Sequence, residues 1–172
     1  MRITVDMVRA ADLGDKYPRA RVELLWAGRE WLSAHAVAGL DIPEWDRVRL
    51  LSYLLGPRDA SREVVRRVTR DAIGDLPLPP AYQEWLDTGD DGLRWPAVEE
   101  AHDALTGAYG LPEFQWFLAN TAVLAEYHEV TAGVINLAVD LAERTGREDA
   151  KTVGGVYLGW MAEWLDSHGE ES

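Results

Sequence analysis

Apolar side chains recur along most of this chain at steps of three and four residues. This is the period of an α-helix that buries one face. Alternation with a period of two, which marks a half-buried strand, is nearly absent, and the one candidate, Ile3–Val5, is too short to form a sheet by itself. The pattern therefore predicts an all-α protein.

Glycine, proline and capping residues divide this pattern into separate segments. Thr4 and Asp41 are placed to cap two helix starts, and Asp59 or Ser61 to cap a third. We expect a single irregular or orthogonal bundle of about seven or eight helices. The predicted helices cover residues 4–14, 18–39, 41–56, 59–74, 81–87, 96–110, 112–146 and 148–167.

The longest segment, 112–146, has one broad face that we expect to lie in the core. Its length favours a break, which we place near Asn120 or Gly133. The predicted buried face consists of Phe114, Phe117, Leu118, Thr121, Leu124, His128, Thr131, Val134 or Ile135, Ala138 and Leu141.

A length of 172 residues fits one domain, 1–172, which is long enough to bury a core without disulfides. The segment 76–80 contains three prolines and is the strongest break in the helical pattern. It could join two halves, 1–75 and 81–172.

Eight tryptophans are unusual in a chain of this size, and each must be packed or used because the indole is costly to leave in water. Trp85 and Trp95 border the loop 88–92, so we expect them to be partly exposed. Four others follow the apolar period and are expected in the core: Trp26, Trp45, Trp160 and Trp164.

The composition excludes several kinds of chemistry. The chain has no cysteine, which excludes disulfides, cysteine-based zinc sites, iron–sulfur clusters and thiol catalysis. No serine lies in a nucleophile elbow, and no glycine-rich phosphate loop or dinucleotide fingerprint occurs. We therefore expect no cofactor and favour a protein that is not an enzyme.

The N-terminal residues do not resemble a secretory signal, and no apolar run approaches the roughly 18 residues that span a bilayer. We expect a cytoplasmic protein that does not enter membranes. The net charge of −13 also disfavours binding to nucleic acid or to an anionic membrane.

The charge is unevenly distributed. Residues 96–143 contain no lysine or arginine. This acidic segment favours a basic partner, although it could also be a solvated surface that aids solubility. Its eight carboxylates are Glu99, Glu100, Asp103, Glu113, Glu126, Glu129, Asp140 and Glu143.

Arginines are concentrated in the predicted helix 59–74 and just before it. Arg58, Arg62, Arg66 and Arg70 step by four residues and form one stripe, and Arg67 lies beside it. The stripe could bind phosphates or an acidic peptide, or it could pair with acids of a neighbouring helix.

A metal site is the one catalytic possibility that the motifs suggest. Glu99 and His102 are three residues apart on a predicted helix, and Glu126, His128 and Glu129 lie close together on another. A di-iron bundle needs two Glu-x-x-His pairs, whereas this chain has one. The acids in the first turn of the helix 96–110 also have a simple structural role, since they stabilise the helix dipole.

We expect a non-catalytic, acidic helical module that binds a basic partner protein. Immunity and antitoxin proteins fit this description by analogy of charge and size. The alternatives are a metal-binding protein or metalloenzyme that uses the Glu/His set, and a scaffold subunit that docks through its arginine stripe. The expected partner-binding residues are Glu99, Glu100, Asp103, Glu126, Glu129, Trp95 and Trp116.

Overall fold

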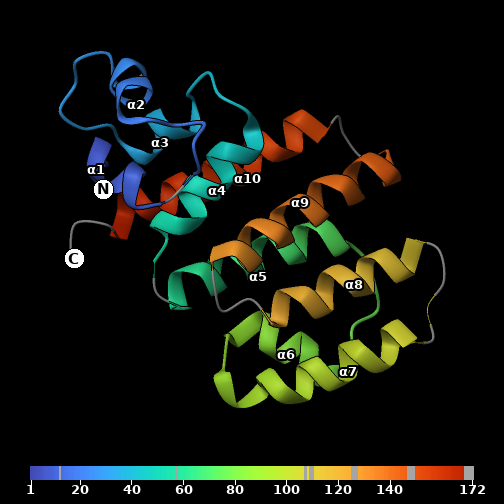
Figure 1. The fold of residues 1–172 in the computed structure, drawn as a ribbon. Helices are drawn as coiled ribbons and strands as arrows, with labels where there is room; N and C mark the ends of the chain where they lie inside the picture. The colour runs from blue at the N-terminus through green and yellow to red at the C-terminus, as the bar shows by residue number, and fades with distance from the viewer. Residues whose placement is uncertain are drawn as a thin grey trace.

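The computed structural model describes residues 1–11, 13–56, 58–106, 108, 111–124, 128–146 and 150–168. In these ranges the chain is helical, as predicted, and one isolated β-bridge joins Ile3 to Leu32. The elements are α1 (Val5–Ala10), α2 (Arg19–Trp26), α3 (Ala34–Ala38), α4 (Glu44–Leu54), α5 (Arg58–Ile73), α6 (Pro80–Thr88), the 3-10 helix η1 (Asp91–Leu93), α7 (Arg94–Thr106), α8 (Leu111–Val123), α9 (His128–Thr145) and α10 (Ala150–His168) (Figure 1).

The number of helices exceeds the predicted seven or eight partly because the segment 18–39 forms two helices. Ala27 and Gly28 both adopt positive φ angles, 49° and 77°, which end α2. Leu32 then exchanges two backbone hydrogen bonds of 2.9 Å with Ile3, so the chain is extended there before α3 begins. The helical period alone did not reveal this pairing, because the partner, Ile3, lies outside the segment, just before α1.

The segment 112–146 is also two helices, and the break lies between Val123 and His128 rather than near Asn120 or Gly133. The predicted face is therefore only partly right before the break: Leu118 is fully buried, whereas Phe114, Phe117 and Leu124 are 38 %, 48 % and 40 % exposed. In α9 the predicted face is buried: Thr131, Val134, Ile135, Ala138 and Leu141.

The predicted helix caps have mixed outcomes. Thr4 caps α1, since its hydroxyl accepts a hydrogen bond from the backbone N–H of Met7 at 3.4 Å. Asp41 does not cap α4, because Pro43 occupies the N-cap position and makes no side-chain cap bond. Ser61 lies inside α5 and is buried, because that helix begins earlier than expected, at Arg58.

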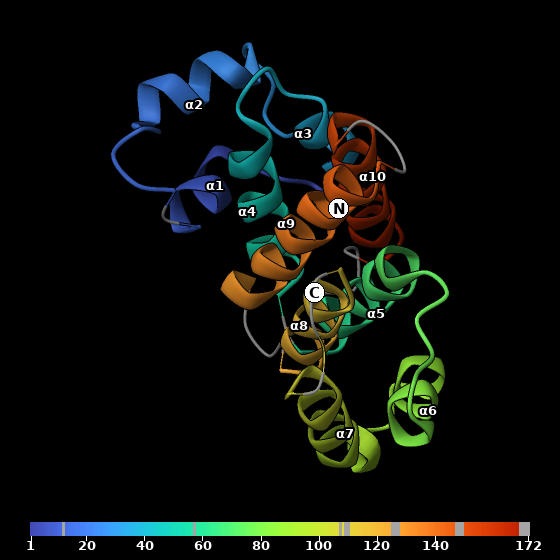
Figure 2. The same cartoon turned by 90° about the vertical axis from the view of Figure 1, so that its right-hand side faces the viewer.

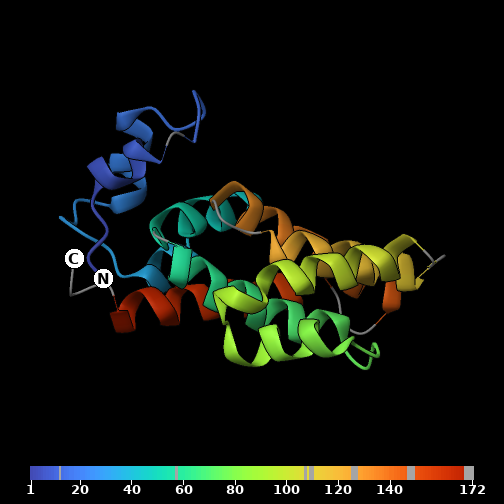
Figure 3. The ribbon, with the colours of Figure 1, turned by 90° about the horizontal axis from the view of Figure 1, so that it is seen from below.

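The core runs along the crossing of the long helices. Helix α9 packs against α4, α5, α8 and α10, and α10 also packs against α3 and α4. Elements on both sides of the proline-containing segment 76–80 thus contribute to one cluster of buried apolar side chains. Helices α1 and α2 lie at one end of the molecule and α6 and α7 at the other, as Figures 2 and 3 also show. Within the described residues, no helix has both the length and the apolar composition required to cross a bilayer.

Asp166 of α10 joins the C-terminal helix to α3. Its carboxylate accepts hydrogen bonds from the backbone N–H groups of Ala34 and His35, at 3.0 and 3.3 Å, and lies 2.8 Å from Nδ1 of His35. Burial alone would raise the pKa of Asp166, but the hydrogen bonds from His35 and Ala34 together lower it below its usual value. Asp166 is therefore more stable as a carboxylate in the folded chain than in the unfolded one.

We predict that Asp166→Ala lowers the free energy of unfolding by about 1–2 kcal/mol at pH 7, because α3 loses an acceptor for two of its free N–H groups. A carboxyl whose pKa is lowered by folding stabilises the fold above its unfolded pKa of about 4. That stabilisation is lost as the pH falls through the folded pKa, so the difference between variant and wild type should shrink below about pH 4. Urea denaturation at several pH values measures both effects. A difference that stays constant down to pH 3 would contradict this role of the charge.

Candidate protein-binding surface

Helix α7 presents one outward face that combines an aromatic side chain with two carboxylates. Trp95, Glu99 and Asp103 are spaced four residues apart and are all exposed, Trp95 to 66 %. The opposite face is formed by Ala97 and Ala101, which are fully buried. These small side chains let α7 pack closely against α6 and α8. The larger side chains on the opposite face of the helix remain exposed to solvent.

The N-terminal end of α7 is tied to the C-terminal end of α8. The guanidinium Nε of Arg94 donates a 3.0 Å hydrogen bond to the backbone oxygen of Val123. Helices α7 and α8 pack against each other as an antiparallel hairpin, visible at the lower edge of Figure 1. The outward face of α7 is thus carried on a braced element rather than on a loop.

Other members of the predicted partner-binding set have different surroundings. The Oε2 atom of Glu100 accepts a 2.9 Å hydrogen bond from the backbone N–H of Tyr82, in the first turn of α6. Trp116 is only 7 % exposed and meets the Tyr82 ring edge-on, with centroids 6.2 Å apart. Glu126 and the side chain of Glu129 lie outside the described residues. The structure therefore brings together Trp95, Glu99 and Asp103 only.

The other tryptophan predictions divide in the same way. Trp26 is buried as expected, whereas Trp45 is 41 % exposed and its prediction as a core residue is wrong. Trp85 was expected to be exposed but is 2 % exposed, because α6 turns it inward beside Tyr82, with ring centroids 5.6 Å apart. Sequence distance from a loop did not indicate which face of α6 points inward.

Trp160 and Trp164 are half-buried at the edge of the core. The guanidinium of Arg67 lies 4.3 Å from the Trp160 ring centroid, and the ring of His168 stacks on Trp164 at 4.5 Å. Arg67 also pairs with Glu163 of α10, at 3.3 Å.

The arginine stripe of α5 contacts α6 and η1. Arg62 pairs with Asp91, and Arg66 pairs with Glu63. Arg66 and Arg70 also donate hydrogen bonds to the backbone oxygen of Leu86, at 3.2 and 2.7 Å. This oxygen belongs to the last turn of α6, where carbonyl groups have no partner within the helix.

Two further contacts strengthen this junction. Arg70 pairs with Asp87 at 3.0 Å, and a hydrogen bond from Gln83, aided by the charge of Arg70, lowers the pKa of Asp87 below its usual value. Gly89 has a φ of 71°, and a Cβ at this position would lie 2.6 Å from Nη1 of Arg66. Three of the five arginines, Arg62, Arg67 and Arg70, therefore pair with acids of neighbouring elements, which is one of the alternatives that the sequence left open. Arg66 pairs with Glu63 of its own helix and reaches α6 through the Leu86 oxygen, and the side chain of Arg58 is not among those described.

We predict that Arg66→Ala lowers the free energy of unfolding by about 1–3 kcal/mol, because its side chain is only 14 % exposed and ties α6 to α5. Arg29→Ala is the matched control, since Arg29 is exposed and the change should stay within about 0.5 kcal/mol. Urea denaturation of both variants checks this. Equal stabilities of the two variants would show that the arginine face is not a structural contact.

The Glu/His set does not form a metal site in the described part of the chain. Glu99 and His102 are both exposed on α7. No group of three histidine, aspartate or glutamate side chains among the described residues could hold a metal ion. Glu126 and the side chains of His128 and Glu129 lie outside those residues.

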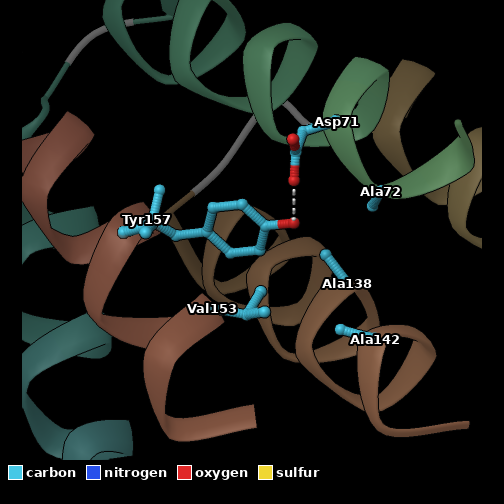
Figure 4. A pocket seen from close by; sticks show the side chains of 7 residues that line it. Asp71, Ala72, Ala138, Ala142, Val153 and Tyr157 are labelled. Atoms are coloured by element: carbon cyan, nitrogen blue, oxygen red, sulfur yellow. Dashed lines mark hydrogen bonds between the residues drawn. The ribbon is translucent and has the colours of Figure 1, made fainter. Parts of the chain in front are cut away.

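A cavity of about 260 Å³ lies between α5, α9 and α10 (Figure 4). The Oη atom of Tyr157 donates a 2.9 Å hydrogen bond to the carboxylate of Asp71, and this bond joins α10 to α5 at the cavity wall. Pockets for drug-sized ligands begin at about 300 Å³. Apart from these two residues, the lining is apolar and consists of Ala72, Ala138, Ala142, Val153 and Val156.

The chain was also compared with known proteins, and no family model, curated protein or solved structure matches it. Among the described surfaces, the outward face of α7 combines an exposed tryptophan with exposed carboxylates. These carboxylates belong to the segment 96–143, which contains no lysine or arginine. Interfaces typically contain an aromatic anchor within a polar rim.

Proposed function

We propose that this protein is a non-catalytic module that binds a basic partner protein through the outward face of α7. The observation that carries the proposal is the position of Trp95, Glu99 and Asp103 on one exposed helix face. The two carboxylates would attract a basic surface and set its orientation, and the indole would anchor it after contact.

The charge distribution supports this choice of partner. The chain has a net charge of −13, and residues 96–143 contain no lysine or arginine. Most of the arginine stripe, by contrast, is occupied by intramolecular contacts with α6, η1 and α10. The acidic surface around α7 is therefore the more available charged surface for a partner.

The finer form of the proposal is neutralisation of a basic protein, as immunity and antitoxin proteins do, and it rests on charge and size. We place this activity in the cytoplasm, which a cysteine-free chain fits.

The proposal predicts association that depends on salt and on two named carboxylates. A basic partner is first captured from the native host, identified and purified. Its association rate with Glu99→Lys/Asp103→Lys should then be at least about tenfold lower than with wild type, because steering by the acidic face is reversed. Trp95→Ala should mainly speed dissociation, by about thirtyfold if the indole is the central anchor. Surface plasmon resonance over a salt series measures both rates.

The matched control is Asp15→Lys/Glu30→Lys, which changes the net charge equally but alters exposed acids beside α2, at the end of the molecule away from α7 (Figure 1). It should retain most of the wild-type association rate. If both double variants slow association equally, net charge rather than α7 is responsible. Association that does not respond to salt would refute the proposal.

A further inference from the structure

The connector between α5 and α6 is a short polyproline II segment. Its sequence, with the first residue of α6, is Leu76-Pro77-Leu78-Pro79-Pro80. A proline fixes its own φ near about −65° and keeps the residue before it out of the helical region. Each residue of 76–79 is a proline or precedes one, and these four residues form no helix or turn. Pro79 has φ −64° and ψ 154°, close to the polyproline II values of about −75° and +145°.

Two prolines of this segment share one exposed edge. Pro80 is the first residue of α6, but the place of its ring depends on its φ, which proline holds at a similar value in a helix and in polyproline II. Polyproline II has three residues per turn, so the rings of Pro77 and Pro80 lie on the same edge, about 9 Å apart along the axis. Both residues are exposed. We call this pair the proline edge.

The other edges of the segment face the protein itself. Leu78 is half-buried and packs against the core, and so does Leu76. The three-residue period explains this burial, because Leu78 lies on a different edge from Pro77 and Pro80. In Figure 2 the connector from α5 to α6 loops out at the right-hand edge of the molecule. The proline edge is therefore accessible to a second protein.

Both ends of the connector are held by hydrogen bonds. The backbone oxygen of Ile73 accepts one from the side-chain amide of Gln115, at 2.9 Å, and one from the backbone N–H of Leu76, at 3.3 Å. The backbone oxygen of Pro79 accepts a 2.9 Å bond from the N–H of Gln83. The extended segment is thus ordered before any partner arrives, and a ligand that is ordered in advance loses less conformational entropy on binding.

The surroundings of the proline edge are acidic. Residues 71–93 contain no lysine or arginine. Glu84 follows Pro80 by four residues on α6, so the two residues are neighbours on one face of that helix, and both are exposed. A binding surface with lysine or arginine at this end would complement the carboxylate of Glu84.

We propose that the proline edge is a ligand for a second protein, which holds it in a groove lined with aromatic side chains and bordered by lysine or arginine. Aromatic-lined grooves recognise segments of the P-x-x-P type because the polyproline II backbone is already formed. Residues 77–80 have this spacing, and the backbone of polyproline II makes no internal hydrogen bonds that a partner must first break. The inference is independent of the proposed function, because it rests on the connector and not on the face of α7.

The test titrates the intact protein into a panel of isotope-labelled WW domains and other small domains that bind proline-rich peptides through an aromatic-lined groove. Some members carry lysine or arginine beside the groove, and others carry acids there. We expect saturable NMR shifts of groove residues, including the indole N–H of a groove tryptophan, with the tightest binding among the members that have a basic border. A panel in which no member shows such shifts would overturn the inference.

Variants locate the binding to the connector. Pro77→Ala/Pro80→Ala should weaken it by at least about tenfold, and Pro77→Ala alone by about threefold or more, because the groove loses rings that fill its pockets. The matched control is Pro18→Ala/Pro43→Ala, which removes two exposed prolines that also lie in extended backbone before helices. Neither of these has another proline three residues away, so the control should bind as wild type does.

Circular dichroism melting confirms that each variant is folded before titration. Equal weakening by both double variants would show that the P-x-x-P spacing is not recognised and would overturn the inference. Glu84→Lys should weaken binding to the members with a basic border, and unchanged binding would overturn that feature of the groove.

The same titrations distinguish this inference from the proposed function. Glu99→Lys/Asp103→Lys should leave binding of the panel within about twofold of wild type, because these residues belong to the face of α7. If this variant abolishes binding and the proline variants do not, the panel binds the acidic face of α7, and the proline edge is only a structural connector.

Discussion

The valine face of α5 packs against α9, and the arginine face of the same helix binds the C-terminal end of α6. Val65 and Val68 are fully buried on the first face, while Arg66 and Arg70 donate to the Leu86 oxygen on the second. The arrangement of the remaining helices depends on this double use of α5. Burial of the first face drives its packing against α9, and the second face adds directional bonds that fix where α6 ends.

The position of α6 in turn determines what the α7–α8 hairpin exposes. Helix α6 places Tyr82 in the interior, where its hydroxyl donates to the Ala119 oxygen of α8 at 2.8 Å and burial raises its pKa. Trp116 packs on the same ring, so the inner side of the hairpin is filled by aromatic side chains. The outer side remains available, with Trp95 and the carboxylates on α7. The proposed binding surface is thus the outer side of an element whose inner side is needed for folding.

Helix type and several helix ends could be predicted from the sequence because they depend on local chemistry. Thr4 caps the helix that follows it, and Arg62, Arg66 and Arg70, which are spaced by four residues, all contact α6 or η1. Burial could not be predicted with the same success for residues near helix junctions. Trp85 and Phe117 show this in opposite directions, since the first is buried beside a loop and the second is exposed within an apolar period. The carboxylates of α7 were identified from charge alone, whereas the exposed apolar side chains of α8 were mistaken for core.

The sequence by itself determined an acidic, cysteine-free, all-helical chain with a cation-free segment at 96–143. These properties follow from composition and from the period of apolar residues, and no long-range contact alters them. Only the tertiary structure decided that the arginines pair with α6, η1 and α10, that Trp116 lies inside, and that Phe117 and Leu124 face solvent. The reason is physical: an apolar period defines one face of a helix, but whether that face is buried depends on which helices pack against it. In α8 the period marks both Leu118, which is fully buried, and Phe117, which is 48 % exposed, so only the packing of the other helices separates the two.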